Sequence, residues 1–170
     1  MNKGVLAVGL AVTLPLLGLL LLNIGRNPMA ISSPLINKAA PDIRLRALEG
    51  GSLQMSGLRG RPAVVNFWAT WCIPCVQEHQ SLTAGARANP DVTFLGIVYE
   101  DTVENARGFL DQRGAAYTTY EDVDGKAAIA FGVYGVPETF FINAKGTIVD
   151  KYVGPLDDET LREKLAAARR

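Results

Sequence analysis

Two apolar runs in the middle of the chain have the composition of buried strands. Residues 63–68 (AVVNFW) and 92–99 (VTFLGIVY) contain few polar residues, as expected of strands that are covered on both faces of a sheet. Between them, residues 72–88 are predicted to be helical, and Asn89-Pro90 would end that helix. The middle of the chain is therefore predicted to form a βαβ unit.

Shorter patterns surround this unit. Residues 43–48 and 52–55 flank a Glu-Gly-Gly turn, and residues 138–142 and 147–153 flank an Asn-Ala-Lys-Gly turn, so each pair is predicted to form a hairpin. A βαβ unit followed by a hairpin and a helix indicates a mixed sheet with helices on both faces. The other predicted elements are helices over residues 102–112, 126–131 and from Asp157 or Asp158 to about 168, and a short strand over 117–120.

The beginning of the chain differs from the rest in its hydropathy. Residues 5–22 carry no charge and consist mainly of Leu, Val, Ala and Gly. A helix of that length rises about 27 Å, close to the hydrocarbon thickness of a bilayer. A cleaved signal peptide is the alternative, although its apolar core would be shorter. We expect a cytoplasmic tip at residues 1–3, a transmembrane signal anchor at 4–24, a linker at 25–40 and one folded domain at 41–170.

Charge and length narrow the class of function. Lys plus Arg equals Asp plus Glu, so the formal net charge of the 170 residues is zero. Nucleic-acid-binding domains usually carry a basic patch, and the sequence has no basic stretch. We therefore expect no nucleic-acid partner. A chain of this length also buries enough surface to fold without a disulfide.

Cys72 and Cys75 are the only cysteines. A structural staple between them would remove little chain entropy, because the benefit of a disulfide grows with loop length. Structural zinc requires four ligands, typically Cys and His, and the chain has a single histidine, His79, and no third cysteine. We expect no metal site, although a Cu(I) site with two sulfur ligands remains an alternative, since soft thiolates suit that ion.

The position of the two cysteines indicates redox chemistry. A predicted strand leads into the motif and a predicted helix leaves it, so Cys72 is expected at a helix N-terminus. The unpaired N–H groups and the helix dipole lower the pKa of a thiol there and favour the reactive thiolate. Cys75 follows three residues later on the same side of the first turn, and Pro74 is compatible with that turn. A C-x-x-C motif near a βαβ pattern is typical of thioredoxin-like proteins.

The segment NFWATWCIPC resembles the thioredoxin active-site signature. The segment GVYGVPETFFI, residues 132–142, resembles the loop in which thioredoxin-like proteins carry a cis-proline beside the cysteines. Together with WCIPCVQEH, it is similar to one subfamily, the membrane-anchored thiol–disulfide reductases of cytochrome c maturation, the DsbE type. The resemblance covers about residues 41–168. It implies an α/β, thioredoxin-like fold: a mixed central sheet flanked by helices, an N-terminal hairpin, a central insertion and one N-terminal transmembrane helix.

The resemblance also implies roles for the cysteines and their neighbours. Cys72 is expected to be the nucleophile and Cys75 the resolving cysteine, and together they form the redox disulfide. The Val136–Pro137 bond is expected to be cis. The Val136 backbone would then turn towards the cysteines and pair with an extended substrate. Trp71, directly before the nucleophile, is expected to shield the disulfide and contact partners, and a position in the core is the alternative.

Three further residues concern the movement of protons. Glu138 stands where many thioredoxin-like proteins have Thr, and a partly desolvated carboxylate there would have a raised pKa, transfer protons and disfavour the nucleophilic thiolate. General thioredoxins have a buried Asp at the position of Asn66, so Glu78 or Glu138 is expected to manage the resolving proton. A solvated helix charge is the alternative for Glu78. Tyr134 is expected either to line the site or only to pack.

Residues 25 onward would be exported whether the N-terminal segment is a transmembrane anchor or a cleaved signal peptide. An exported bacterial domain meets conditions that oxidise thiols. We expect a single-pass protein of the bacterial inner membrane with its catalytic domain in the periplasm. It would reduce the disulfide of an apocytochrome c haem-attachment segment, C-x-x-C-H, or of a thiol chaperone that carries it. A membrane thiol–disulfide carrier would donate the electrons, and no cofactor is needed.

Several other activities remain as alternatives. They are general extracytoplasmic disulfide reduction, disulfide formation by an oxidase, and Cu(I) transport by the dithiol. A peroxidase of the peroxiredoxin type is not expected. That family places Thr three residues before its cysteine, whereas this chain has Ala69.

Overall fold

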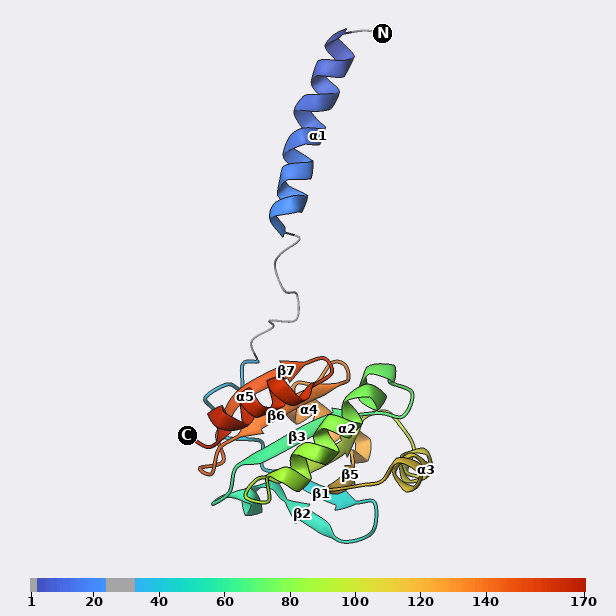
Figure 1. The fold of residues 1–170 in the computed structure, drawn as a ribbon, viewed down its shortest axis with the longest axis vertical. Coiled ribbons are helices and arrows are strands. Elements are labelled where there is room, and N and C mark those ends of the chain that lie inside the picture. The colour runs from blue at the N-terminus through green and yellow to red at the C-terminus, as the bar shows by residue number, and fades with distance from the viewer. Residues whose placement is uncertain (1–2, 24–32) are drawn as a thin grey trace. The chain divides into compact units, whose positions relative to one another are not determined.

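The computed structural model describes residues 3–23 and 33–170 (Figure 1). The chain divides into two units between Ile31 and Ser32. The described part of the first unit is helix α1 (Lys3–Asn23). By hydropathy, none of the helices within residues 3–23 and 33–170 qualifies as a membrane-spanning segment. The expected linker residues 25–32 and most of the expected tip lie outside the described residues.

The second unit is built on a seven-stranded mixed sheet in the order β2-β1-β5-β4-β3-β6-β7. Its three middle strands β5, β4 and β3 are parallel, and the outer strands join them in antiparallel pairs. The prediction of a mixed sheet is therefore confirmed. The strands are β1 (Arg44–Ala47), β2 (Ser52–Gln54), β3 (Ala63–Trp68), β4 (Thr93–Val98), β5 (Thr118–Glu121), β6 (Glu138–Ile142) and β7 (Ile148–Val153).

Helices cover both faces of this sheet (Figure 1). Because side chains alternate along a strand, β3 contributes to two cores. Val64 packs with residues of α2 and α5 on one face, while Val65 and Phe67 pack with residues of α4 on the other. The helices are α2 (Ile73–Ala88), α3 (Val103–Arg113), α4 (Lys126–Phe131) and α5 (Asp158–Ala168), with short 3-10 turns η1 (Met55–Leu58) and η2 (Val123–Gly125).

Three aromatic rings fix the strands that carry the cis-proline loop and the cysteines. Phe67 lies 5.4 Å from Phe131 and 5.9 Å from Phe140, measured between ring centroids, and Phe131 lies 4.9 Å from Phe140. All three residues are fully buried. Burial of a Phe side chain contributes about 2–3 kcal/mol, so this cluster holds β3, β6 and α4 rigidly together.

The folded unit begins earlier than the sequence pattern predicts. Residues 33–40, which the pattern places in the linker, hydrogen-bond to the final hairpin. The backbone N–H of Asn37 donates to the Ile148 carbonyl across 2.8 Å, and that of Ala40 to the Gly146 carbonyl across 2.9 Å. Leu35 and Ile36 pack against the core. The boundary expected after residue 40 is corrected accordingly: backbone pairing with the sheet edge, not composition, decides where the unit starts.

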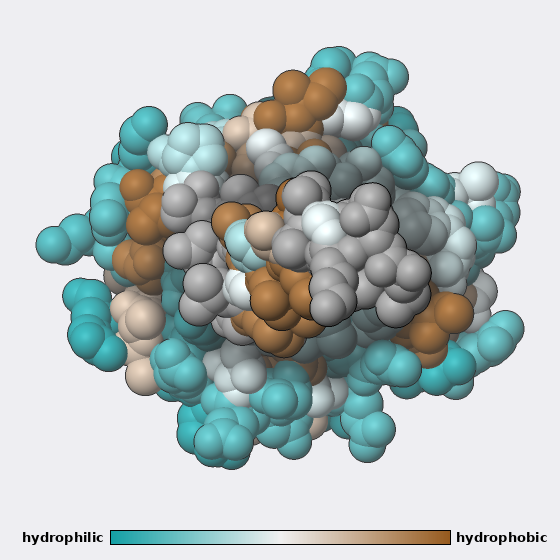
Figure 2. All heavy atoms as spheres, turned by 90° about the horizontal axis from the view of Figure 1, so that it is seen from above, coloured by the Kyte–Doolittle hydropathy of each residue, from teal (hydrophilic) through white to brown (hydrophobic). Residues whose placement is uncertain are grey.

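On the face that Figure 2 shows, the rim of the folded unit is mainly hydrophilic. In the space-filling view, hydrophilic residues dominate the visible periphery, and hydrophobic residues there form small, separate patches (Figure 2). Small separate patches are normal for a soluble domain and indicate no function by themselves.

Candidate redox site

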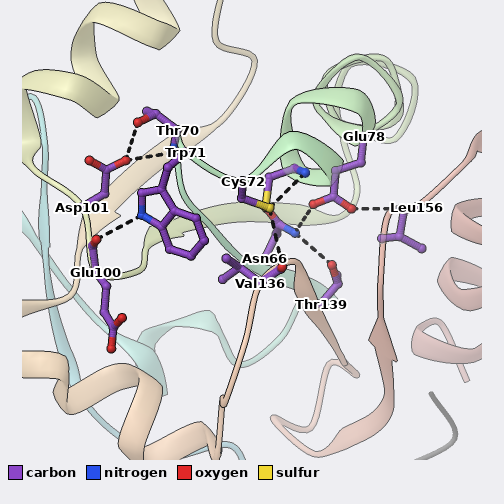
Figure 3. Close-up of a disulfide and its surroundings, with 11 residues drawn as sticks. Asn66, Thr70, Trp71, Cys72, Glu78, Glu100, Asp101, Val136, Thr139 and Leu156 are labelled. Atoms are coloured by element: carbon purple, nitrogen blue, oxygen red, sulfur yellow. Dashed lines mark hydrogen bonds between the residues drawn. A yellow bond between two sulfur atoms is a disulfide. The ribbon is translucent and has the colours of Figure 1, made fainter. Parts of the chain in front are cut away.

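Cys72 and Cys75 form a disulfide at the N-terminus of α2 (Figure 3). Cys72 is the N-cap residue, and the backbone N–H of Cys75 donates to its Sγ across 3.2 Å. The two residues are 4% and 3% exposed. When the disulfide is reduced, the same N–H group and the helix dipole stabilise a thiolate at Cys72. Exposure hardly distinguishes the two sulfurs, whereas the helix terminus favours Cys72 as the reactive one.

The loop before β6 brings a backbone carbonyl to the disulfide. The Val136–Pro137 peptide bond is cis. The carbonyl oxygen of Val136 lies 3.5 Å from Sγ of Cys72 (Figure 3). On the other side of the loop, the N–H of Gly154 donates to the Pro137 carbonyl across 3.0 Å. An extended peptide that paired with the Val136 backbone would thus lie directly beside the sulfur.

The segment before Cys72 is held by the carboxylate of Asp101, in the loop between β4 and α3. Oδ2 of Asp101 accepts hydrogen bonds from the backbone N–H and the hydroxyl of Thr70, at 2.8 and 2.5 Å (Figure 3). Its Oδ1 accepts from the N–H of Thr102 and from Asn105 Nδ2, at 2.7 and 2.9 Å. Partial burial raises the pKa of Asp101, but these hydrogen bonds outweigh burial and lower it. Asp101 is therefore ionised and fixes the backbone two residues before Cys72.

Trp71 lies beside this carboxylate and is anchored by the neighbouring residue. Its Nε1 donates to the carbonyl of Glu100 across 3.2 Å (Figure 3). Glu100 adopts a positive φ of 45°, which is uncommon for a residue with a side chain. The Trp71 residue is 57% exposed although its indole N–H is bound. The ring is thus held in place at the rim of the site with much of its surface available to a partner.

Glu78 lies inside the domain, one turn beyond Cys75 on α2. It is 2% exposed. Its Oε1 accepts a hydrogen bond from Asn66 Nδ2 at 2.8 Å and its Oε2 one from the N–H of Leu156 at 2.9 Å (Figure 3). Burial raises the pKa of Glu78 to about 7, although the hydrogen bonds from Leu156 and Asn66 act in the opposite direction. Glu78 is therefore not a solvent-exposed charge on the helix surface, which was the alternative interpretation of this residue.

Asn66 links Glu78 to the cis-proline strand. Its Nδ2 also donates to the Thr139 hydroxyl at 3.0 Å, so both hydrogens of the amide are used (Figure 3). Asn66 is 2% exposed and Thr139 is fully buried. The neutral strand residue thus orients a carboxylate that belongs to the neighbouring helix.

Glu138 lies on the opposite face of the sheet from Glu78. Side chains alternate along β6, so Thr139 faces Asn66 while Glu138 shares the other face with Phe140. Glu138 is fully buried, and its Oε2 lies 2.8 Å from Nζ of Lys151. Glu138, which was expected to act as an acid or base beside the sulfurs, is therefore a buried carboxylate paired with the ammonium group of Lys151.

Tyr134 lies over that cation. The Nζ of Lys151 is 4.6 Å from the centroid of the Tyr134 ring. The tyrosine is 57% exposed, whereas the Lys151 side chain is 3% exposed. Tyr134 therefore both faces solvent at the cis-proline loop and covers a buried ion pair. His79 is half-buried, and its Nε2 is 2.9 Å from the Gly114 carbonyl.

Sequence reasoning missed Lys151 and Asp101. Apart from Asp150, the residues around Lys151 in the strand IVDKYV are apolar, so this lysine is a signal that a buried partner exists. Asp101 is the third residue after the buried parallel strand β4, and ligand sites in α/β sheets lie beyond the carboxyl ends of such strands. Thr139 and the backbone of Leu156 gave no signal, because their contacts with Asn66 and Glu78 depend on the fold.

A thioredoxin-like domain with a cysteine pair at a helix N-terminus and a cis-proline beside it defines a thiol–disulfide oxidoreductase. Comparison with known proteins identifies the group. The chain belongs to the AhpC/TSA family, whose model matches residues 36–151, and its curated relatives are thiol:disulfide interchange proteins.

Two curated relatives and one solved structure illustrate the likeness. The thiol:disulfide interchange protein DsbE of Pseudomonas fluorescens biotype C is 40% identical over 98% of this chain and 94% of its own. The thiol:disulfide interchange protein HelX of Rhodobacter capsulatus is 36% identical over 82% of this chain and 80% of its own. A secreted Mycobacterium tuberculosis disulfide oxidoreductase homologous to E. coli DsbE is 31% identical, with a TM-score of 0.69 over 74% of this chain and 96% of its own. The protein is a thiol:disulfide interchange enzyme, and Cys72 and Cys75 are its redox pair.

Proposed function

We propose that the protein reduces the disulfide of an apocytochrome c haem-attachment segment, or of a thiol chaperone that carries it. One observation carries the proposal: Sγ of Cys72 lies 3.5 Å from the Val136 carbonyl, so an extended peptide paired with that backbone presents its disulfide to the nucleophile. The particular substrate is supported by GVYGVPETFFI and WCIPCVQEH, which resemble the cytochrome c maturation type.

The proposed reaction transfers two electrons from the dithiol to the substrate. The Cys72 thiolate attacks one substrate sulfur, the substrate disulfide breaks, and its other sulfur leaves as a thiolate that takes up a proton. Cys75 then loses its proton and attacks Cys72, which restores the Cys72–Cys75 disulfide and releases the second substrate thiol. A membrane thiol–disulfide carrier returns the two electrons to the pair. No step requires a cofactor.

We assign the resolving proton to Glu78. It lies on the same helix as Cys75, one turn further on, and both residues are buried. A carboxyl group whose pKa is about 7 can accept and return a proton near neutral pH. Glu138 is less suited to this task, because it faces the other side of the sheet and is paired with Lys151.

We also propose that residues 4–24 anchor the protein in the bacterial inner membrane and that the folded unit lies in the periplasm. Support comes from α1, which carries no charged residue after Lys3, and from relatives that align over 98% of this chain. Partition of the full-length chain into washed membranes, and release of the folded unit by a protease added outside spheroplasts, would support the anchor. Recovery in the soluble periplasmic fraction would contradict it. Among the side chains of α1 that the structure describes, eight large apolar ones are exposed: Leu10, Val12, Leu14, Leu16, Leu17, Leu19, Leu20 and Leu21.

The first experiment is the equilibrium reduction potential of the Cys72–Cys75 pair in the full-length chain. A value of about −200 mV or lower is expected of a reductant, and a value near −120 mV is that of a strong oxidant such as DsbA. The second value would replace the proposed reduction by disulfide formation. A reductant should then be tested on an oxidised C-x-x-C-H peptide, with the same peptide lacking the histidine as the control.

A further inference from the structure

A buried ion pair lies behind the cis-proline loop and takes no part in the exchange steps above. The Nζ of Lys151 is 2.8 Å from Oε2 of Glu138, and their side chains are 3% and 0% exposed. Removing two charges from water is unfavourable, and packed apolar residues of similar volume often stabilise a core equally well or better. The pair therefore indicates a requirement other than stability at this position.

Lys151 contacts more than Glu138. Its Nζ lies 4.6 Å from the centroid of the Tyr134 ring and 5.2 Å from that of Phe140. A cation over an aromatic face is attracted by the ring quadrupole, and more strongly where water is excluded. Lys151 thus holds a rim tyrosine on one side and a buried carboxylate on the other.

Both of these partners belong to the segment that carries Val136. Tyr134 precedes Val136 by two residues, and Glu138 follows it by two. Lys151 comes from β7, where it lies opposite Phe140 in the sheet register. One ammonium group therefore ties β7 to the chain on both sides of the carbonyl that faces Cys72.

We propose that Lys151 is a positioning residue for exchange with peptide disulfides. By binding Tyr134 and Glu138 together, it keeps the Val136 backbone in the orientation that an extended substrate needs. The inference rests on the exchange site proposed above, but not on the identity of its substrate. Because Lys151 has no contact with the sulfurs among the described residues, its effect depends on whether the substrate has a backbone to align.

Two disulfide probes separate alignment from intrinsic reactivity. The first, 2-hydroxyethyl disulfide, has no peptide backbone; the second is a cysteine-containing hexapeptide dimerised through its disulfide. With either probe, the reduced full-length chain is oxidised at Cys72 and Cys75, and two thiols are released. In Lys151→Met, the second-order rate constant with the peptide should fall about tenfold, since small displacements of positioning groups are costly. The rate constant with 2-hydroxyethyl disulfide should stay within about twofold, because that probe requires no alignment.

Three further variants complete the test. The control is Lys164→Met. The Nζ of Lys164 lies 2.9 Å from Oδ2 of Asp150 on β7, and both side chains of this ion pair are partly exposed. Both rate constants should stay unchanged in this variant. Lys151→Arg keeps the charge and should retain most of the peptide rate. Glu138→Gln combined with Lys151→Met leaves no unpaired buried charge, so it should fold even if Lys151→Met alone does not, and it should show the same selective loss.

The outcome is decided by the ratio of the two rate constants. A selective loss with the peptide probe, in Lys151→Met or in the double variant, supports the positioning role. An equal fall of both rate constants would mean that Lys151 acts on the sulfurs or on folding. No fall in either rate constant would mean that the cis-proline loop keeps its orientation without Lys151. Either of these results overturns the inference. Because the peptide carries no haem-attachment sequence, neither result bears on the proposed cytochrome substrate.

Discussion

The side-chain amide of Asn66 donates a hydrogen bond to the Glu78 carboxylate across 2.8 Å. General thioredoxins have an aspartate at this strand position, whereas here the strand supplies a neutral donor and the helix supplies the acid. The second carboxylate oxygen accepts from the N–H of Leu156. Both donors favour the ionised form, yet burial dominates and raises the pKa of Glu78 to about 7. An internal acid that titrates near neutral pH thus lies one helical turn from Cys75.

Replacement of Glu78 by Gln should slow the resolving step. In the variant no carboxylate on α2 can take the proton of Cys75, and general acid–base groups typically contribute about 10²-fold or more. The mixed disulfide between Cys72 and a peptide should therefore resolve about 10²-fold more slowly at neutral pH. The rate of peptide release after rapid mixing, followed from pH 5.5 to 8.5, gives the measurement.

The matched control is Glu163→Gln, a glutamate on α5 whose side chain is 76% exposed. It should leave the rate and its pH profile unchanged. If Glu78→Gln resolves the mixed disulfide as fast as the unmodified protein across the whole pH range, Glu78 does not carry the proton.

The same carboxyl group should make stability depend on pH. The pKa of Glu78 is about 7 in the folded domain against an ordinary value of 4.5, so the folded state binds the proton more tightly than the unfolded state. The free energy of unfolding should fall as pH rises from about 4.5 to about 7 and then level off. The shift corresponds to about 3 kcal/mol.

Urea unfolding of the oxidised protein at pH 5 and pH 8.5 tests this dependence. In Glu78→Gln, this contribution should vanish, so the variant should gain stability relative to the unmodified protein between the two pH values. Other titrating groups cancel in that comparison. The same fall in both proteins would show that Glu78 does not titrate in this range.

The sequence predicted the elements that surround the redox pair well. The strands β3 and β6 have the predicted bounds, because every residue in them is buried and the apolar pattern reflects that burial. The helix α4, which buries only one side, also has the predicted bounds. Asp157, one of the two residues expected to start the last helix, caps α5, since a side chain that binds its own helix N-terminus is a local signal. The failure at residues 33–40 has the opposite cause: their backbone partners are Gly146, in the turn before β7, and Ile148, at its start, more than a hundred residues away.

The candidate site was less predictable than the fold. Motifs identified Cys72, Cys75 and Pro137, but Glu78 and Glu138 could not be told apart from the sequence. Their environments differ because of the strand alternation that places Thr139 towards Asn66 and Glu138 towards Lys151. That distinction requires the register of β6 against β3 and β7, which no local pattern contains.

Asp101 should control the geometry in front of the nucleophile. Asp101→Ala removes the acceptor of two hydrogen bonds from Thr70, and a bond to a charged group contributes about 1.5–3 kcal/mol. We expect the variant to be less stable by about 2 kcal/mol and to lose the fixed position of Trp71. Urea unfolding gives the first quantity, and the change in Trp71 emission between the oxidised and reduced forms gives the second.

Asp111→Ala, at an exposed position on α3, is the control for this change and should behave like the unmodified protein. An intact redox-dependent change of emission in Asp101→Ala would show that the contact with the Glu100 carbonyl alone holds the ring.

The two cysteines should behave differently although both are almost buried. Only Cys72 combines the N-cap position with the contact to the Val136 carbonyl, so it alone should form the mixed disulfide. Cys75→Ser should accumulate a stable covalent adduct with an oxidised peptide, whereas Cys72→Ser should form at most a trace. Mass spectrometry of the alkylated, non-reduced proteins measures both yields. Equal adduct yields in the two variants would mean that the helix terminus does not select the nucleophile, and the order of attack would have to be reassigned.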